Sequence, residues 1–403
     1  MSRTTQRYNN KRDQIIAEAR TLISERMIDA VTFADVAAEL GIHTSTIYHY
    51  FGSIDKMRAE VMLDTCRIRR ELIAAAQGTT ALDRLLDYLY KDIACRDLIR
   101  LLRVELLSAR QRNRVEKAIE ANIDVLQQLI EAGIRDGSIR SCDSGLTART
   151  VHDVAERLST HLDPNIAEIN QSTSETAEAV VAVIRDGLLP EAETRLPSID
   201  HFKRFPDLSF ALSADDRLEI ILKEIVTSVS RYGVPATSIP KVAASLGMTK
   251  TTIYRYAEDK EELLYLCLLR NSRLLFAVTT TISAMTDQPL EALLLLTWYS
   301  SVIDRSDSGP LTHGGFLPHL TIQHQRVISH EQSRHRATMA AWAKRASERG
   351  LMREIDSNVV QVLFYTLMRM TRLYADLRTL PGRDRGFDAI MSTILLGLAP
   401  RRS

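Results

Sequence analysis

The sequence predicts an all-α protein built from two similar units, each with a small three-helix head and a larger helical body. Apolar residues recur at spacings of three and four along most of the chain, and no stretch shows the period-two alternation of a strand bounded by turns. In addition, one helical pattern occurs twice at a constant spacing of 206 residues. That spacing is too long for a solenoid repeat and indicates two whole domains.

The first copy of the pattern, residues 32–57, predicts two short helices around a tight turn. Thr32 can cap the first helix together with Asp35, and Gly41 allows the backbone to leave it. The second helix, about 44–50, turns Ile47 inward and exposes polar and aromatic side chains, namely Thr44, Ser45, Thr46, His49 and Tyr50. A short helix with such an exposed face is typical of a helix-turn-helix that reads a DNA groove.

The second copy, residues 238–263, repeats the first in the same register. One copy alone would be a moderate signal, because Ala-Ala-x-Leu-Gly also occurs in ordinary helical hairpins. The residues common to both copies make chance a poor explanation. In the second copy they are Val242, Ala243, Ala244, Leu246, Gly247, Thr252, Ile253, Tyr254 and Tyr256.

The composition is that of a folded, helix-rich, soluble chain, with 45% hydrophobic and 26% charged residues. The net charge of +1 gives no overall attraction to nucleic acid, so a DNA-binding surface must be locally basic. The first 14 residues are polar, and the longest apolar run, near 293–303, is too short to cross a bilayer, which favours the cytoplasm without a membrane segment. The cysteines lack metal-site spacing and predict reduced thiols: Cys66, Cys95, Cys142 and Cys267.

The order of patterns predicts five segments. Residues 1–12 are basic without an apolar period and predict a mobile arm, and a helix follows from Asp13. Residues 191–213 have no sustained period and predict a linker, whose basic residues either repeat the role of the arm or serve only solubility. The expected segments are a first DNA-binding head (1–60), a first regulatory body (61–190), the linker (191–213), a second DNA-binding head (214–268) and a second regulatory body (269–403).

Both bodies are expected to consist of successive helices. In the first half these are about 53–77, 80–95, 97–110, 112–136, 146–162 and 173–188, and in the second about 258–285, 288–305, 318–349, 357–378 and 384–397. The last two helices of each half carry apolar stripes with no partner left in that half. We therefore expect these four helices to form a bundle that pairs the halves within one chain.

The two motifs resemble the TetR family of transcriptional regulators, and the chain resembles two full-length members fused in tandem. The resemblance is strongest over residues 12–63 and 218–269, whereas the bodies match only in helix order and in their closing Gly-Leu-x-Pro turns. It implies an operator in double-stranded DNA and a small-molecule effector as partners, with no cofactor.

Carried over residue by residue, the resemblance implies two unequal heads. Thr249 suits the cap of the recognition helix and Lys250 follows it, whereas His43 and Thr44 stand there in the first head. The positions that contact DNA in the family are Tyr48, His49 and Tyr50 in the first head and Tyr254, Arg255 and Tyr256 in the second.

Three further positions differ between the heads. The family's phenylalanine is Phe51 in the first head but Ala257 in the second. Its phosphate-binding lysine is Lys260 in the second head but Ile54 in the first, and the glycine before helix two is Gly233 in the second head only.

The residue types support these roles independently. Base edges are read by short polar side chains and by arginine and lysine, and such residues form the exposed faces Thr44, Ser45, Thr46 and Lys250, Thr251, Thr252. Tyrosine hydroxyls can donate to phosphate, although Tyr48 and Tyr254 could instead pack beneath the helix.

Weaker patterns lie in the second body. Five histidines stand five or six residues apart, namely His313, His319, His324, His330 and His335. This spacing does not place neighbours on one helical face, so solvated or pocket-lining histidines are favoured over a metal site. Five aromatic residues either line an effector cavity or belong to the core: Trp298, Tyr299, Phe316, Phe364 and Tyr365. No serine-histidine-acid set or glycine-rich phosphate loop is present, so we expect no enzyme.

Together these patterns predict a cytoplasmic, sequence-specific DNA-binding regulator, namely a repressor that a ligand releases. Ligand in a body cavity would favour a head separation that no longer matches successive major grooves. The alternative is an architectural or protein-interaction module in which one or both heads no longer read sequence, which Ile54 and Ala257 keep open.

Overall fold

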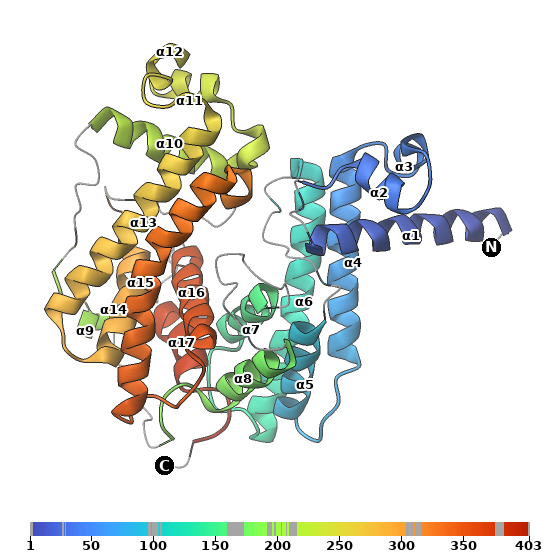
Figure 1. Cartoon of the computed structure of the whole chain (residues 1–403). Helices are drawn as coiled ribbons and strands as arrows, with labels where there is room; N and C mark the ends of the chain where they lie inside the picture. The colour runs from blue at the N-terminus through green and yellow to red at the C-terminus, as the bar shows by residue number, and fades with distance from the viewer. Residues whose placement is uncertain are drawn as a thin grey trace. The chain divides into compact units, whose positions relative to one another are not determined.

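The computed structural model describes residues 3–25, 28, 30–95, 98, 104, 107–158, 173–191, 196, 199–202, 204–206, 208, 216–303, 306, 309–310, 316–374 and 383–401. Every regular element in these ranges is helical, so the all-α prediction is confirmed (Figure 1). Packing divides the chain into two compact units. Unit 1 consists of Met1–Ile139, Val151–Leu162 and Gln171–Glu178, and unit 2 of Arg140–Thr150, Asp163–Asn170 and Ala179–Ser403.

The head of unit 1 is formed by α1 (Arg3–Glu25), α2 (Phe33–Glu39) and α3 (Thr44–Phe51). The predicted capping box begins α2, because the Thr32 hydroxyl accepts from the backbone N–H of Asp35 and the Asp35 carboxylate accepts from that of Thr32. Apolar side chains at helical spacing meet in a closed core with no exposed surface at Ile15, Ala19, Val31, Val36 and Ile47.

Helix α1 begins at Arg3 and not near Asp13, so the prediction of a mobile arm over residues 1–12 was wrong from Arg3 onward. Residues 3–12 contain neither glycine nor proline. Once the apolar turns after Ile15 are fixed on the core, each added residue extends an existing helix and needs no new nucleus. Arg12 on this extension donates to Glu60 over 2.5 Å.

The body of unit 1 contains α4 (Ile54–Ala74), α5 (Ala81–Ala94) and α6 (Ala109–Asp136). Helix α4 packs along α6, and α5 contacts both (Figure 1). The hydroxyls of Ser53 and Thr80 cap α4 and α5. Most of the helix expected over residues 97–110 lies outside the described residues.

A charged network crosses the core of unit 1. The guanidinium of Arg69 donates to Asp92 over 3.0 Å and to Glu156 over 2.5 Å, and all three side chains are almost fully buried. Burial lowers the pKa of Arg69 and the two carboxylates raise it, with a net rise. The Tyr88 hydroxyl also donates to Asp92. Removing one partner would leave a buried charge uncompensated. The network therefore holds α4, α5 and the helix that carries Glu156 in one arrangement.

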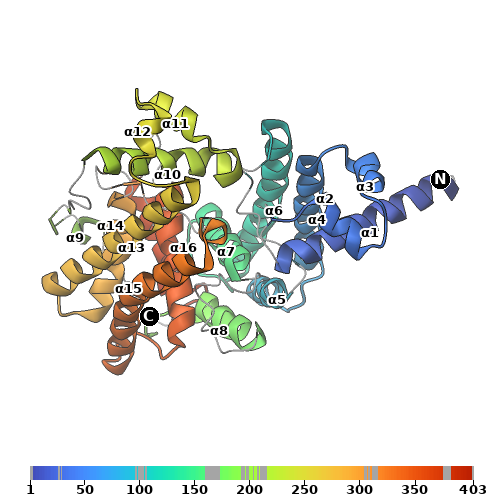
Figure 2. The ribbon, with the colours of Figure 1, turned by 45° about the horizontal axis from the view of Figure 1, so that its top comes forward.

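Unit 2 begins its head with α10 (Asp216–Ala236), α11 (Ile239–Ser245) and α12 (Lys250–Ile253), which lie together at one end of α13 (Lys260–Met285) in both views (Figures 1 and 2). Helix α10 is interrupted at Gly233, whose φ of 76° is left-handed. The remaining elements are α14 (Pro289–Ile303), η3 (Leu317–His319), α15 (Ile322–Glu348), α16 (Ser357–Tyr374) and α17 (Arg383–Leu395).

Helix α13 is the one described helix that is long and apolar enough to cross a membrane by length and composition. Its apolar side chains are instead core residues, because Leu263, Cys267 and Leu274 are fully buried or nearly so. It packs against α10, α14 and α15, while α14 and α15 both contact α16. We therefore assign α13 as a core helix.

Helices α7 (Ser144–Leu158) and α8 (Thr173–Asp186) are each divided between the two units, and the turn that follows α8 belongs to unit 2. In that unit the turn pairs with the turn after α17 through reciprocal backbone hydrogen bonds. Leu188 N–H donates to Ile394 O over 3.0 Å, and Leu398 N–H donates to Ile184 O over 2.9 Å. The same exchange links Leu189 with Leu395 and Ala399 with Arg185.

A close glycine contact makes this pairing possible. Gly187 and Gly397 have φ values of 76° and 72°, and a Cβ on Gly397 would overlap the backbone of Gly187 and Arg185. The turns after α6 and α15 add a matching pair of bonds: Arg140 N–H donates to Leu398 O, and Arg353 N–H donates to Leu188 O. Corresponding residues of the two turns thus exchange roles, which is the pattern of a two-fold interface.

The expected linker contains a short helix, α9 (Ile199–Phe202), in unit 2. Phe202 is buried and stacks on Trp298 of α14 with ring centroids 6.3 Å apart. His201 Nε2 lies 2.6 Å from a Glu291 carboxylate oxygen, and the Tyr299 hydroxyl donates to Pro206 O. These contacts dock His201, Phe202 and Pro206 on α14, whereas the sequence analysis found no sustained period there and predicted only a linker.

Candidate nucleic-acid interface

The recognition helix of the first head, α3, has one buried and one exposed face. Ile47 and Phe51, one turn apart, are buried and anchor the helix. The predicted contact residues Thr44, Ser45, Tyr48 and His49 are exposed, and Thr46 and Tyr50 are half-buried.

Tyr48 is 62% exposed, and its ring lies edge-on to that of Phe33, with centroids 6.4 Å apart. This exposure excludes the alternative that Tyr48 packs in the core, and it leaves the hydroxyl available to a phosphate. His43 caps α3 with its backbone only, as expected from its poor match to the family's cap.

The recognition segment of the second head is shorter. Helix α12 ends at Ile253, so it is shorter than the helix over about 250–256 that the repeat of residues 44–50 at a spacing of 206 predicts. The Thr249 hydroxyl caps it by accepting from Thr252 N–H, as predicted. Ile253 is fully buried, but Ala257 stands at the position of Phe51. An alanine offers far less apolar surface than a phenylalanine, so the last turn has a weaker anchor.

The basic groups of the second recognition segment lie outward. Lys250, Thr251 and Arg255 are exposed, and Thr252, Tyr254 and Tyr256 are half-buried. The Lys250 ammonium lies 5.3 Å from the centre of the Tyr254 ring, a cation–π contact that orients both side chains. The alternative that Tyr254 packs beneath the helix therefore stays open.

Lys260 at the start of α13 is half-buried, and its ammonium donates to Val234 O over 2.5 Å. Burial lowers its pKa from the ordinary value. A similar contact exists in the first head, where Arg58 donates to Val31 O over 3.3 Å. A phosphate contact by Lys260 stays a prediction, and one of its donors is already used within the head.

Lys56 is a candidate that the sequence analysis missed. It is exposed in the first turn of α4, and its Nζ lies 3.7 Å from where a Cβ on Gly52 would stand, at the end of α3. The resemblance places Ile54 at the family's phosphate-binding position. Lys56 was missed because it stands two residues after that position. The signal that could have found it is a lysine within one turn of a capping serine, here Ser53.

The aromatic residues predicted for an effector cavity do not gather around one described pocket. Trp298 lies against Phe202, and the buried Tyr299 bonds to Pro206. Phe316 belongs to the core of the second head. Phe364 is fully buried in α16, and the Tyr365 hydroxyl lies 2.7 Å from His335 Nε2.

The predicted histidine positions are likewise separate. His313 lies outside the described residues. His324 pairs with Glu261 at 2.9 Å, and burial lowers the pKa of His335 to about 3. Among the described residues, no group of three or more histidine, cysteine, aspartate or glutamate side chains could hold a metal ion.

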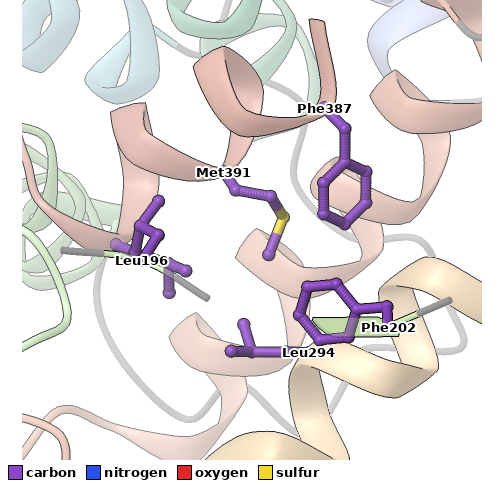
Figure 3. A pocket seen from close by; sticks show the side chains of 6 residues that line it. Leu196, Phe202, Leu294, Phe387 and Met391 are labelled. Atoms are coloured by element: carbon purple, nitrogen blue, oxygen red, sulfur yellow. The ribbon is translucent and has the colours of Figure 1, made fainter. Parts of the chain in front are cut away.

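An apolar cavity of about 10 Å³ lies in unit 2 (Figure 3). Its wall consists of Leu196, Phe202, Leu294, Phe387, Met391 and Leu395. Two of its wall residues, Phe202 and Phe387, contact the predicted cavity residue Trp298. The volume is below the range of roughly 300–1,000 Å³ that is usual for ligand sites. The sequence analysis missed this pocket because its lining comes from three distant segments of the chain.

Comparison with known proteins finds a family model that matches both heads. Residues 15–61 and 221–265 each match the model described as bacterial regulatory proteins, tetR family. The chain is 29% identical over 157 residues to the HTH-type transcriptional repressor KstR2 of Rhodococcus jostii (strain RHA1), which covers 36% of this chain and 77% of that protein.

Solved structures with a similar fold include a bacterial regulatory protein in the tetR family from Rhodococcus RHA1. It has a TM-score of 0.37 and 17% identity, and the match covers 43% of this chain and 93% of that one. The TetR family transcriptional regulator PfmR from Thermus thermophilus has a TM-score of 0.36 and 21% identity, with 43% and 96% covered.

Proposed function

We propose that this chain, a member of the TetR family of bacterial regulatory proteins with the family's N-terminal region in two tandem copies, is a cytoplasmic repressor that acts as a single-chain pseudo-dimer. The observation that carries the proposal is the repeated helix-turn-helix with its exposed polar recognition residues in the same register. The similarity to a transcriptional repressor supports the sign of regulation. The boundaries given above for heads, linker and bodies are part of this proposal.

The reciprocal hydrogen bonds between the turns after α8 and α17 support the pseudo-dimer. A two-fold interface pairs the same surface of two subunits, and here equivalent backbone groups of one chain satisfy each other. A second chain could not use these groups without first opening both turns. We therefore expect light scattering at micromolar concentration to show the 45.4 kDa monomer, whereas a stable particle of twice that mass would contradict the proposal.

Release by a small molecule is the regulatory part of the proposal. An effector that binds one head separation better than another shifts the population by its difference in affinity for the two. DNA binding requires both recognition helices to face successive major grooves, so a shift in separation would lower operator affinity.

The direct test is selection of binding sites from a random DNA pool by the full chain. A repressor should select a defined sequence and keep a large ratio of specific to non-specific affinity in competitor DNA, on the order of 10³ or more. The second candidate function, an architectural module with a degenerate head, is favoured by the one-turn α12 and by Ala257. It predicts binding without sequence preference at one or both half-sites.

A further inference from the structure

We propose that the first turn of α13, residues 260–262, is a hub that positions the second recognition segment (residues 249–257) from the side of the body, with Glu261 as its central positioning residue. The hub replaces an aromatic anchor that this head lacks, since Ala257 stands where the first head has Phe51. The inference rests on the proposed function, because it concerns how the second head holds its DNA-reading face.

Two side chains of the hub hold the region on either side of the recognition segment. Lys260 donates to Val234 O near the end of α10 over 2.5 Å. Glu262 Oε2 accepts from the backbone N–H of Glu258 over 2.6 Å, and Asp259 accepts from the N–H of Glu262 over 2.9 Å. The chain is therefore tied to α13 directly after the last residue of the recognition segment.

Glu261 joins the hub to the long body helix α15, which lies beside α13 in both views (Figures 1 and 2). Its Oε1 accepts from the N–H of Thr321, the cap of α15, over 2.6 Å. His324 Nδ1 lies 2.9 Å from the same oxygen, and the His324 ring stacks on Tyr265 of α13 with centroids 3.9 Å apart. A carboxylate is stabilising at a helix N-terminus, so the start of α15 and the hub hold each other.

The first unit has the capping part of this arrangement but not the hub. Asp55, 206 residues before Glu261, accepts from the N–H of Ser108, the cap of α6, over 2.9 Å and from its hydroxyl over 2.7 Å. Ile54 and Lys56 stand at the positions of the two other hub side chains. Isoleucine cannot donate and lysine cannot accept a hydrogen bond, so this turn does not hold the first recognition helix in the same way.

The two recognition segments therefore depend on different contacts. Helix α3 spans eight residues and is fixed within its own head by the buried Ile47 and Phe51. Helix α12 spans four residues around the buried Ile253, and the small Ala257 offers little apolar surface a turn later. Opening of the second segment breaks fewer apolar contacts, so the bonds of the hub account for a larger share of its protection.

The test removes the same carboxylate from both units of the full chain. Hydrogen exchange followed by mass spectrometry is measured for residues 249–257 in Glu261→Ala and for residues 43–51 in Asp55→Ala. Each variant loses one helix cap and one negative charge beside its head. We expect Glu261→Ala to exchange residues 249–257 about three- to tenfold faster than the wild type, and Asp55→Ala to change residues 43–51 by less than about twofold.

Two further variants separate the hub from general loosening of unit 2. His324→Gln removes the ring stack but keeps the bond between Glu261 and Thr321, so we expect a smaller acceleration of residues 249–257, about twofold. Tyr365→Phe removes a hydroxyl bonded to His335 in the same unit, away from these contacts, and should leave that exchange unchanged.

Three exchange results would overturn the hub. They are unchanged exchange of residues 249–257 in Glu261→Ala, equal acceleration of both recognition segments by the two carboxylate variants, and equal acceleration of residues 249–257 by Tyr365→Phe and Glu261→Ala.

Selection of DNA sites by the same proteins tests the consequence for binding. Glu261→Ala should relax the sequence preference in the half under the second head, whereas Asp55→Ala should keep the preference in the other half. Unchanged preference in both variants would show that the hub does not position the reading face. A wild type that selects no defined site would refute the repressor, and the exchange measurements would still decide on the hub.

Discussion

The two recognition segments carry the same motif but form different lengths of helix. In the first head α3 spans eight residues and is anchored by Ile47 and Phe51. In the second head α12 spans four residues, and after the anchor Ile253 the next inward position holds only Ala257. The shared residues specify the turn between the helices, whereas one buried side chain a turn later decides how far the recognition helix continues.

The largest expected effect is that of Phe51→Ala, which gives the first head the pattern of the second. The loss of a buried aromatic ring should lower the free energy of unfolding by about 3–5 kcal/mol and shorten α3 toward one turn. Urea unfolding followed by circular dichroism measures the first change, and hydrogen exchange of the α3 amides measures the second.

The control for this experiment is Tyr48→Ala on the exposed face of the same helix. It removes a ring of similar size and should change the free energy of unfolding by no more than about 0.5 kcal/mol. If both variants cost the same, burial of Phe51 is not what sets the length of α3.

A smaller effect is expected from Lys250→Ala, which sharpens the difference between the reading faces. Lysine bonds well to guanine edges, whereas the equivalent Thr44 offers a weaker and less exclusive contact. We therefore expect unlike half-sites, and the variant should relax the guanine preference in the half under the second head alone, at a cost of about 1–3 kcal/mol. Sites selected by the wild type, by Lys250→Ala and by Thr44→Ala are compared. A symmetric palindrome from the wild type would contradict the prediction.

Most of the fold was predictable, because helical periodicity, caps and the repeated motif are local properties of the sequence. The capping role of Thr32 followed from residue type and spacing, and that of Thr249 from the resemblance to the family. The extension of α1 to Arg3 was not predictable, because continuation of a helix without apolar residues depends on the helix to which it is attached.

The pocket and the docking of α9 depend on tertiary contacts, which explains why the sequence did not indicate them. Phe202 lies in a stretch without a sustained apolar period, and its burial depends on Trp298 and Phe387 far along the chain. The lengths of α3 and α12 were partly predictable. The sequence shows that Ala257 occupies the position equivalent to Phe51, but the effect on helix length follows only from how these side chains pack.

The second helices of the two heads, α2 and α11, begin differently, and removing a single hydroxyl from each tests this difference. Thr32 forms a capping box with Asp35, whereas Ser238 makes no side-chain hydrogen bond at the start of α11. Thr32→Ala should therefore lower the free energy of unfolding by about 1 kcal/mol, and Ser238→Ala should leave it nearly unchanged. Thermal or urea unfolding of the two variants gives the comparison, and equal losses would show that the capping box is not the source of the difference.

The smallest expected effect concerns the lysines that we propose for phosphate contacts, Lys56 in the first head and Lys260 in the second. Each phosphate contact contributes about 0.9 to the slope of log affinity against log salt. Both Lys56→Ala and Lys260→Ala should therefore flatten the slope by about one unit on every DNA sequence. Binding titrations between about 50 and 200 mM salt measure this change.

The two lysines should differ in their effect on the head itself. Lys260 donates to Val234 O and is half-buried, whereas Lys56 is exposed. Lys260→Ala should also lower the free energy of unfolding, by less than about 1 kcal/mol because water reaches the group, and Lys56→Ala should not. If Lys260→Ala destabilises the head but leaves the salt slope unchanged, its ammonium serves the fold of the second head and does not touch DNA. The phosphate contact at the start of the fourth helix would then belong to the first head through Lys56.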